Sequence, residues 1–499
     1  DANATPITAE QLKDIQGVTG VVDADIADYN AAFVAAPSPF ADINNPTVAE
    51  INAVIASVNA INELVEDLNG DANATVLTLA QLKDIQGLED IIDANMSGYN
   101  AAFVAAPSPF ADIDNPTTAE INAVIDEVNS DVALAELVED LNGDTNATAL
   151  TAEQLKDIQG IVGVVDADIA DYNAAFVAAP SPFADINNPT VAEINAVIAS
   201  VNAINELVED LNGNANATVL TLTELKAIQG LEDIIDANMS GYNTAFVAAP
   251  SPFADINNPT IAEINAVIDE VNSDVALAEL VEDLNGDTNA TALTAEQLKD
   301  IQGVTGVVDA DIADYNAAFV TAPSPFADIN NPTVAEINAV IASVNAINEL
   351  VEDLNGDANA TVLTLTELKA IQGTEDIIDA NMTGYNTAFV AAPSPFADID
   401  NPTIAEINAV IDEVNSDVAL AELVEDLNGD TNATALTAEQ LKDIQGVTGV
   451  VDADIADYNA AFVAAPSPFA DINNPTVAEI NAVIASVNAI NELVEDLNG

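Results

Sequence analysis

The side chains that most often perform catalysis are rare in this chain. Its 499 residues include no His, Cys or Arg, the usual general base, thiol nucleophile and guanidinium clamp of enzymes. Seven lysines are the only basic side chains. Lys13 lies near Glu10 and Asp14, as is typical of a solvated helix surface, and carboxylates such as Asp23 and Asp25 are expected on a solvated face too. We therefore predict that the protein is not an enzyme.

The richest run of potential metal ligands follows a helix-like segment that ends near Gly70. Oxygen-bearing side chains occupy every second position there: Asp67, Asn69, Asp71, Asn73 and Thr75. The spacing is similar to the first half of an EF-hand calcium loop. The similarity is partial, because Gly70 is at the fourth place rather than the sixth and Thr78 stands where a bidentate Glu belongs. Calcium binding at this joint is one hypothesis.

The same residues have a second interpretation that needs no ion. Asn69 and Gly70 are typical of a helix end, and the Asp, Asn and Thr after them favour turns. The pattern returns at the next joint with the candidate ligands Asp140, Asn142 and Asp144. A later joint has Asn214 in place of the Asp. Calcium ligation and helix capping both remain open from the sequence.

Asn-Ala-Thr tripeptides occur at regular intervals and match the N-glycosylation pattern. The acceptors would be Asn3, Asn73, Asn146, Asn216, Asn289, Asn359 and Asn432. Three further matches begin at Asn95, Asn238 and Asn381. In a secreted and glycosylated chain they would place glycans at regular spacing. The alternative is that these asparagines only serve turns.

The composition excludes several partners. The net charge is −77, and without a Lys or Arg cluster nothing neutralises phosphates, so we expect no nucleic acid and no anionic membrane surface as partner. This charge suits a salty medium or cations, while 49% hydrophobic content argues against disorder. No disulfide can form, and because no run of 18 apolar residues occurs, we expect no membrane span.

The chain is a tandem repeat. The motif Leu-Val-Glu-Asp-Leu-Asn-Gly closes a unit seven times, and units of 70 and 73 residues alternate, so the full period is 143 residues. The predicted repeats are 1–70, 71–143, 144–213, 214–286, 287–356, 357–429 and 430–499. Because the sequence starts in phase and has no initiator Met, we expect it to be a segment of a longer array.

The first repeat predicts a short helix and then a longer one. Thr8 and Gln11 form a capping box that opens a helix over 9–16. A second helix is expected over 20–36, with Thr19 as a cap and Pro37 after its end. Its apolar stripe would be Val22, Ile26, Tyr29 and Phe33. From the loop that follows, Phe40 and Ile43 are expected to turn inward.

A third, long helix completes the repeat. Thr47 and Glu50 form a second capping box, and apolar residues spaced by three and four continue to Leu68. On this helix Asn52, Asn59 and Asn62 either bond to neighbouring helices or another chain, or form a solvated flank. The 73-residue repeats carry three extra residues here, which displace the apolar stripe by about 60°.

These patterns predict an all-α fold, a linear array of seven tandem three-helix bundles in the order short, long, long. A 70-residue bundle is marginal alone, so neighbouring repeats should support each other. Near-identical repeats suit a protein whose output is distance and stiffness. We therefore expect an extracellular stalk, cable or filament-forming spacer. The alternative is a set of binding modules that each present a helix face to a partner protein.

The repeat architecture, the Thr-x-x-Glu/Gln helix starts and the acidity resemble, in a general way, the helical repeat arrays of giant bacterial and archaeal surface adhesins and fibre proteins. No diagnostic motif carries this resemblance, and it extends over the whole chain. It implies a cell-surface or extracellular location, a role in adhesion or biofilm scaffolding, and calcium. Expected partners are neighbouring repeats and other copies of the chain, in a filament or bundle.

Overall fold

The computed structural model describes residues 5–71, 75–144, 148–214, 218–287, 291–357, 361–430 and 434–498. Within these ranges all regular secondary structure is helical, which confirms the all-α prediction. The chain divides into two compact units, Asp1–Asn265 and Ala266–Gly499.

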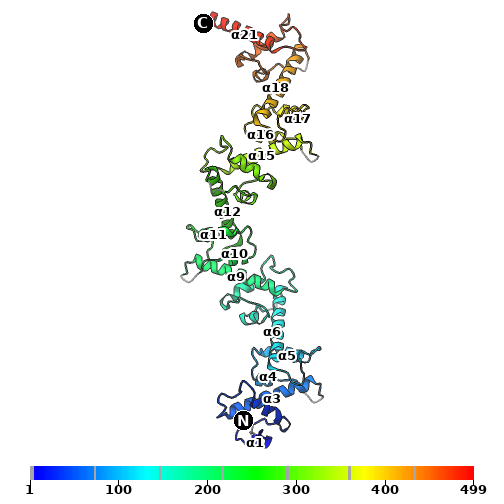
Figure 1. Cartoon of the computed structure of the whole chain (residues 1–499), viewed down its shortest axis with the longest axis vertical. Helices are drawn as coiled ribbons and strands as arrows, with labels where there is room; N and C mark the ends of the chain where they lie inside the picture. Colours follow the sequence, from blue (N-terminus) through cyan, green and yellow to red (C-terminus); the bar gives the residue numbers. More distant parts are fainter. Residues whose placement is uncertain are drawn as a thin grey trace. The chain divides into compact units, whose positions relative to one another are not determined.

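Each repeat holds a short α-helix, a 3-10 turn, an eight-residue α-helix and a long α-helix, and this succession recurs along the chain (Figure 1). The first unit contains α1 (Ala9–Lys13), η1 (Asp23–Asp25), α2 (Ile26–Phe33), α3 (Val48–Leu68), α4 (Leu79–Asp84), η2 (Asp93–Asn95), α5 (Met96–Phe103), α6 (Thr118–Leu141), α7 (Ala152–Asp157), η3 (Asp166–Asp168), α8 (Ile169–Phe176), α9 (Val191–Leu211), α10 (Leu222–Ala227), η4 (Asp236–Asn238) and α11 (Met239–Phe246).

The boundary between the units falls within α12 (Ile261–Leu284). The second unit continues with α13 (Ala295–Asp300), η5 (Asp309–Asp311), α14 (Ile312–Phe319), α15 (Val334–Leu354), α16 (Leu365–Ala370), η6 (Asp379–Asn381), α17 (Met382–Phe389), α18 (Ile404–Leu427), α19 (Ala438–Asp443), η7 (Asp452–Asp454), α20 (Ile455–Phe462) and α21 (Val477–Asn498).

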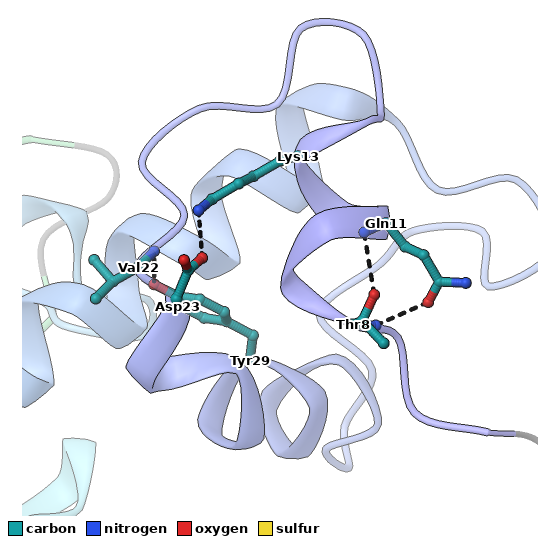
Figure 2. A network of polar contacts seen from close by, with 6 residues as sticks. All are labelled: Thr8, Gln11, Lys13, Val22, Asp23 and Tyr29. Carbon is teal, nitrogen blue, oxygen red and sulfur yellow. Dashed lines mark hydrogen bonds and ion pairs between the residues drawn. The ribbon is translucent and has the colours of Figure 1, made fainter.

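Capping boxes start the short and the long helices, as predicted. The Thr8 hydroxyl accepts the Gln11 N–H at 3.2 Å, and the Gln11 side chain accepts the Thr8 N–H at 2.9 Å (Figure 2). Thr47 and Glu50 make the same reciprocal pair at the start of α3. Each box satisfies two N–H groups that the first helical turn would otherwise leave unpaired.

The second helix is shorter than the sequence predicted. Instead of spanning 20–36, it begins with η1 and ends at Phe33. Gly20 has φ +77° and Val22 is extended, so these residues are not helical and the helix begins only after Val22. Thr19 does not cap it either, because the N-cap position is taken by Val22, three residues later, without a side-chain cap hydrogen bond. The first helix likewise ends at Lys13 rather than at residue 16.

Two other details of the predicted packing are wrong for the first repeat. Val22 is 46% exposed and lies outside the apolar stripe, since its extended backbone precedes the helix. Ile43 is 70% exposed, whereas its counterpart Ile113 in the second repeat packs against a core. Phe40 does turn inward, with its ring centroid 5.8 Å from that of Phe33, and the intervening Ala36–Pro37 peptide bond is cis.

Each long helix in the first unit is built into two consecutive cores. The first half of α3 packs with α1 and α2 through Ile51, Val54, Ile55 and Val58. Its second half, through Ala60 and Leu64, belongs to the next core, together with α4, α5 and the start of α6. The second half of α6 then enters the core of the third repeat through Ala133 and Leu137.

The second unit repeats the arrangement. Val344 of α15 lies in the core of the fifth repeat, and Ala346 and Leu350 lie in that of the sixth. On α18 the residues up to Ile411 serve one core, and Ala419 and Leu423 serve the next. Three α-helices per repeat are therefore present as predicted, but each later core also takes in half a helix from the repeat before it.

Candidate functional site: the joint between consecutive repeats

The long helices end in a Schellman motif. The Gly70 N–H donates to the Asp67 carbonyl and the Asp71 N–H donates to the Glu66 carbonyl, both at 3.0 Å. Gly70 has φ +67°, the left-handed conformation that this motif requires and that glycine adopts without strain. The interpretation of these residues as a helix cap is thereby confirmed. The predicted ligands Asp67, Asn69 and Asp71 all belong to this cap.

The cap residue Asn69 also reaches the next repeat. Its side-chain amide donates to the Val65 carbonyl at 3.1 Å and to the Asp114 carboxylate at 2.9 Å. Asn142 does the same with Val138 and Asn187. Comparable bonds join Asn355 to Asp400 at 2.9 Å and Asn428 to Asn473 at 3.1 Å. One asparagine thus ends each of these helices and holds the loop of the following repeat.

The remaining predicted ligands are not all within the described part of the chain. Thr75 donates its N–H to the Glu63 carboxylate at 2.9 Å, and its hydroxyl bonds to the same oxygen. Asp140 and Asp144 occupy the cap of α6, where their backbone groups complete the motif. Asn73 lies outside the described residues. Within the described ranges no three acidic side chains converge in a way that could hold a metal ion.

The predicted glycosylation sites fall into two groups. The seven Asn-Ala-Thr asparagines (Asn3, Asn73, Asn146, Asn216, Asn289, Asn359 and Asn432) lie outside the described residues. Asn95, Asn238 and Asn381 are described; Asn95 and Asn381 are buried, with 9% and 8% exposure, and Asn238 is half-buried. Asn95 donates to Asn129 at 2.9 Å, so a glycan on Asn95 would have to displace a buried hydrogen bond. The structure gives Asn95 a role without a glycan, as part of the turn η2 and as the donor of this buried hydrogen bond.

A serine midway along α3 and its counterpart on α6 also contact the next repeat. The Ser57 hydroxyl accepts the Gln86 N–H at 2.9 Å, and Ser130 on α6 accepts the Gln159 N–H at 3.0 Å. Ser57 is 7% exposed. Each hydroxyl therefore ties the backbone just after the short helix of one repeat to the long helix of the repeat before it.

The three extra residues of the 73-residue repeats change how the two cores share the helix. In α3 the residues facing the two cores interleave: Val58 serves the first core, whereas Ser57 and Ala60 serve the next. In α6 they are separate, because Asn129 is the last residue of the first set and Ser130 begins the second. Three residues lengthen a helix by about 4.5 Å, so consecutive cores lie further apart along α6.

A pocket of about 400 Å³ opens at this longer joint. Its lining includes Asp90, Asp126, Asn129, Lys156 and Asp157. Asp90 lies before η2, Asp126 lies on α6 and Asp157 lies on α7, so two consecutive repeats contribute the carboxylates. Asp90 has φ +53°, a left-handed conformation that Asp tolerates better than most residues.

The carboxylates of this pocket disfavour each other's charge. Burial, followed by the neighbouring Asp90 and Glu89 charges, raises the pKa of Asp126. Burial, followed by the Asp90 charge, raises the pKa of Asp157. The corresponding Asp412 and Asp443 of the second unit have raised pKa values for the same reasons, with Asp376 as the charged neighbour.

Elsewhere in the repeat, polar side chains hold the irregular segment between the first two helices. Asn52 donates to the Gly17 carbonyl at 3.0 Å and Asn59 to the Gly20 carbonyl at 2.9 Å. Asn62 donates to the Asp28 carboxylate at 3.3 Å. The sequence left open whether these asparagines bond or are only solvated, and the structure shows that they bond within the repeat.

The lysines form ion pairs that the sequence did not predict. Lys13 makes an ion pair with Asp23, ten residues ahead, rather than with Glu10 or Asp14 (Figure 2). Lys83 pairs likewise with Asp93 at 2.6 Å. Both partners are largely exposed, and such pairs contribute at most about 1 kcal/mol. The lysine side chains are therefore held on the surface by structural contacts.

Sequence reasoning missed the carboxylates of the pocket. Comparison of the repeats would have found them: the 70-residue repeats have Gly20 and Ala56 where the 73-residue repeats have Asp90 and Asp126. It missed Ser57 too, because one serine on an apolar helix face gives no periodic signal.

Four long helices, α3, α9, α15 and α21, are apolar and long enough to cross a membrane, by length and composition alone. The sequence-based expectation of no span rested on the lack of an uninterrupted apolar run and stays a prediction. In the structure, 39% of the most apolar stretch of α3 is buried, and its apolar side chains pack against two protein cores.

The chain is a tandem helical repeat protein, in which a long helix belongs to the hydrophobic cores of two consecutive repeats. Its most specific polar contacts lie at the joints between repeats. No family model matches the chain, and no solved structure matches it.

Among curated proteins, the chain is similar to "Extracellular matrix-binding protein ebh" of Staphylococcus aureus. Identity is 24% over 462 residues in strain MRSA252, covering 90% of this chain, and 23% over 426 residues in strain JH9, covering 76%. The chain spans only 4% of the length of these relatives.

Proposed function

We propose that the chain is a length-setting stalk segment of a cell-surface or extracellular repeat protein. The observation that supports this role is the shared long helix. Because α3 is built into two cores, the second repeat cannot turn about α3 without breaking buried contacts. A chain joined in this way transmits orientation from repeat to repeat, as a spacer must.

Small-angle scattering of the whole chain tests the proposal. A stalk should give a cross-section close to that of one repeat and a maximum dimension that scales with the number of repeats. A compact particle, or the scattering of a flexible coil, would contradict it. Measurements at low and high salt separate intrinsic stiffness from charge repulsion, since about 0.1 M salt screens charges beyond roughly 10 Å.

A second proposal is that the repeats bind a partner protein. The relatives are named for binding extracellular matrix, and the repeats could each present a surface to such a protein. The test is binding of the chain to immobilised matrix proteins. Saturable binding would favour repetitive binding modules. If the chain does not bind but small-angle scattering shows an intact rod, the pure spacer is favoured.

Self-association and calcium are further proposals that distinct measurements address. Electron microscopy at several salt concentrations separates single rods from filaments or bundles. Calcium at the helix caps near Asp67 and Asp71 would raise the melting temperature more than an equal concentration of magnesium does. If both ions raise the melting temperature equally, the effect is charge screening and not a specific calcium site. Mass spectrometry of material from a glycosylating source would test Asn73 and its equivalents.

A further inference from the structure

The joints of this chain come in two kinds that differ in buried charge. Where a 73-residue repeat meets the next repeat, three positions carry carboxylates: Asp90, Asp126 and Asp157 in the first case. Aligned sequence places Asp233, Asp269 and Asp300 in the second case and Asp376, Asp412 and Asp443 in the third.

The other three joints follow the 70-residue repeats and lack this crowding. The same three positions are Gly20, Ala56 and Asp84 at the first of them, with one carboxylate. At the next they are Gly163, Ala199 and Ala227, and at the last Gly306, Ala342 and Ala370, with none. The carboxylate trio therefore occurs at every second joint.

Geometry explains why the trio accumulates where it does. The longer α6 separates the two cores along the helix and leaves the pocket that the three carboxylates line. In a short joint the residues of α3 that face the two cores interleave along the helix. The carboxylates are thus brought together by two repeats, so their repulsion acts across the joint and not within one repeat.

The charges around the trio do not compensate it. Asp157 faces Asp90 and Asp126, and Glu153 is beside it on α7. Glu89 adds to the negative potential at Asp126, and Glu136 and Glu153 line an adjoining pocket of about 780 Å³. The single cation nearby, Lys156, already pairs with Asp166. Like charges in a partly buried site repel more strongly than in water.

We propose that two joints after 73-residue repeats, the one with Asp90, Asp126 and Asp157 and the one with Asp376, Asp412 and Asp443, respond to protons: they tighten when a carboxylate of the trio is neutralised, whereas the joints after the 70-residue repeats do not. The chain then contains both constitutive and responsive joints, and the responsive ones follow 73-residue repeats. This inference goes beyond the stalk role and holds wherever the chain works.

The direction follows from linkage. Asp126 and Asp157 have pKa values raised above the ordinary 3.8, so the folded joint holds their protons more tightly than the unfolded chain does. Stability of the joint therefore rises as pH falls from neutral through the raised pKa values, and the gain is complete below 3.8. The capping-box glutamates act oppositely, but only below their ordinary value of 4.5.

Hydrogen exchange of the whole chain can read the two kinds of joint separately. Residues 148–160, 291–303 and 434–446 share one sequence, and all three follow a 73-residue repeat. Residues 218–230 and 361–373 share another and follow 70-residue repeats. As pH falls from 7 to 4, the protection factor of the first peptide should rise several-fold relative to that of the second. A constant or falling ratio would overturn the proposal.

A charge-removing variant gives an independent test at neutral pH. Asp126→Asn should slow cutting by a lysine-specific protease at Lys156, while Lys299 and Lys442 in the same molecule keep their rates. Each cut produces a fragment of distinct length, so the sites are separately counted. Asp84→Asn, which removes the lone carboxylate of a short joint, is the matched control and should leave cutting at Lys83 unchanged. Cutting at Lys156 that stays equal to that at Lys299 and Lys442 would refute the proposal.

Discussion

Within the 499-residue chain, the shared helix predicts that the leucine at one repeat position matters where the next repeat packs on it and not where it is exposed. Leu64 in the second half of α3 is 1% exposed and lies in the core of the second repeat. Leu493 occupies the same position of α21 and is 57% exposed. The two leucines have identical neighbours in sequence, so they isolate the effect of packing from that of helix propensity.

The expected magnitudes differ accordingly. Truncation of a buried leucine to alanine costs about 2–5 kcal/mol, because apolar burial is lost and a cavity remains. Leu64→Ala should therefore raise the population of the opened joint by about 30-fold to 4,000-fold, at tenfold for every 1.4 kcal/mol. Leu493→Ala should stay within about 0.5 kcal/mol, as is usual for an exposed position.

The lysines make the assay site-specific. The chain has one lysine in the short helix of each repeat, and Lys83 follows the joint that contains Leu64. When reclosing is faster than cleavage, the rate of cutting reports the population of the opened form. Leu64→Ala should accelerate cutting at Lys83 far more than at Lys226 or Lys369. Similar effects of Leu64→Ala and Leu493→Ala, or acceleration spread evenly over all lysines, would refute the idea that α3 is shared by two cores.

Three other predictions test packing, capping and charge. Gly98→Ala should destabilise the second repeat by about 1–3 kcal/mol, because a Cβ at Gly98 would lie 2.9 Å from a Val128 methyl group. Ser97→Ala, at an exposed position of the same helix, is the control, and equal changes in Lys83 cutting by the two variants would count against this. The Thr47 hydroxyl and then the N–H groups of Ala41 and Thr47 lower the pKa of Glu50 below 4.5. The stabilisation of the helix by this carboxylate is present above pH 4.5 and is lost as pH falls through the lowered pKa, so helical circular dichroism should decrease in that acid range. A long helix that keeps its thermal stability there would contradict the capping role. With a net charge of −77, the melting temperature should rise between 0.01 and 0.5 M NaCl as repulsion is screened, and a melt indifferent to salt would exclude repulsion as a major destabilising factor.

The sequence predicted the long helix accurately because its signals are local and agree with one another. The capping box at Thr47 and Glu50, the three-four spacing of the apolar residues and Gly70 all act within a few residues of each other. The bounds Val48–Leu68 follow. The second helix was overextended, since nothing in the apolar spacing reveals that Gly20 takes a left-handed conformation and that Val22 is extended.

What could not be predicted is which core each half of the long helix serves. Ile55 and Leu64 look alike in an apolar pattern, and only the fold shows that one packs within its repeat and the other with the next. The calcium hypothesis illustrates the same limit. Alternating oxygens near Asn69 fit both an ion and a helix cap, and the structure places Asn69 in a cap that also bonds to Asp114.

The mismatch between sequence repeat and folded core has a consequence for how such a gene can change length. A deletion or duplication that breaks at matching points within two α3-type helices rejoins a first half to an identical second half. Every hydrophobic core is then restored, whichever copies were lost or gained. Arrays built in this way can be shortened or extended by whole 143-residue periods without any new contact having to evolve, so selection can adjust reach independently of stability.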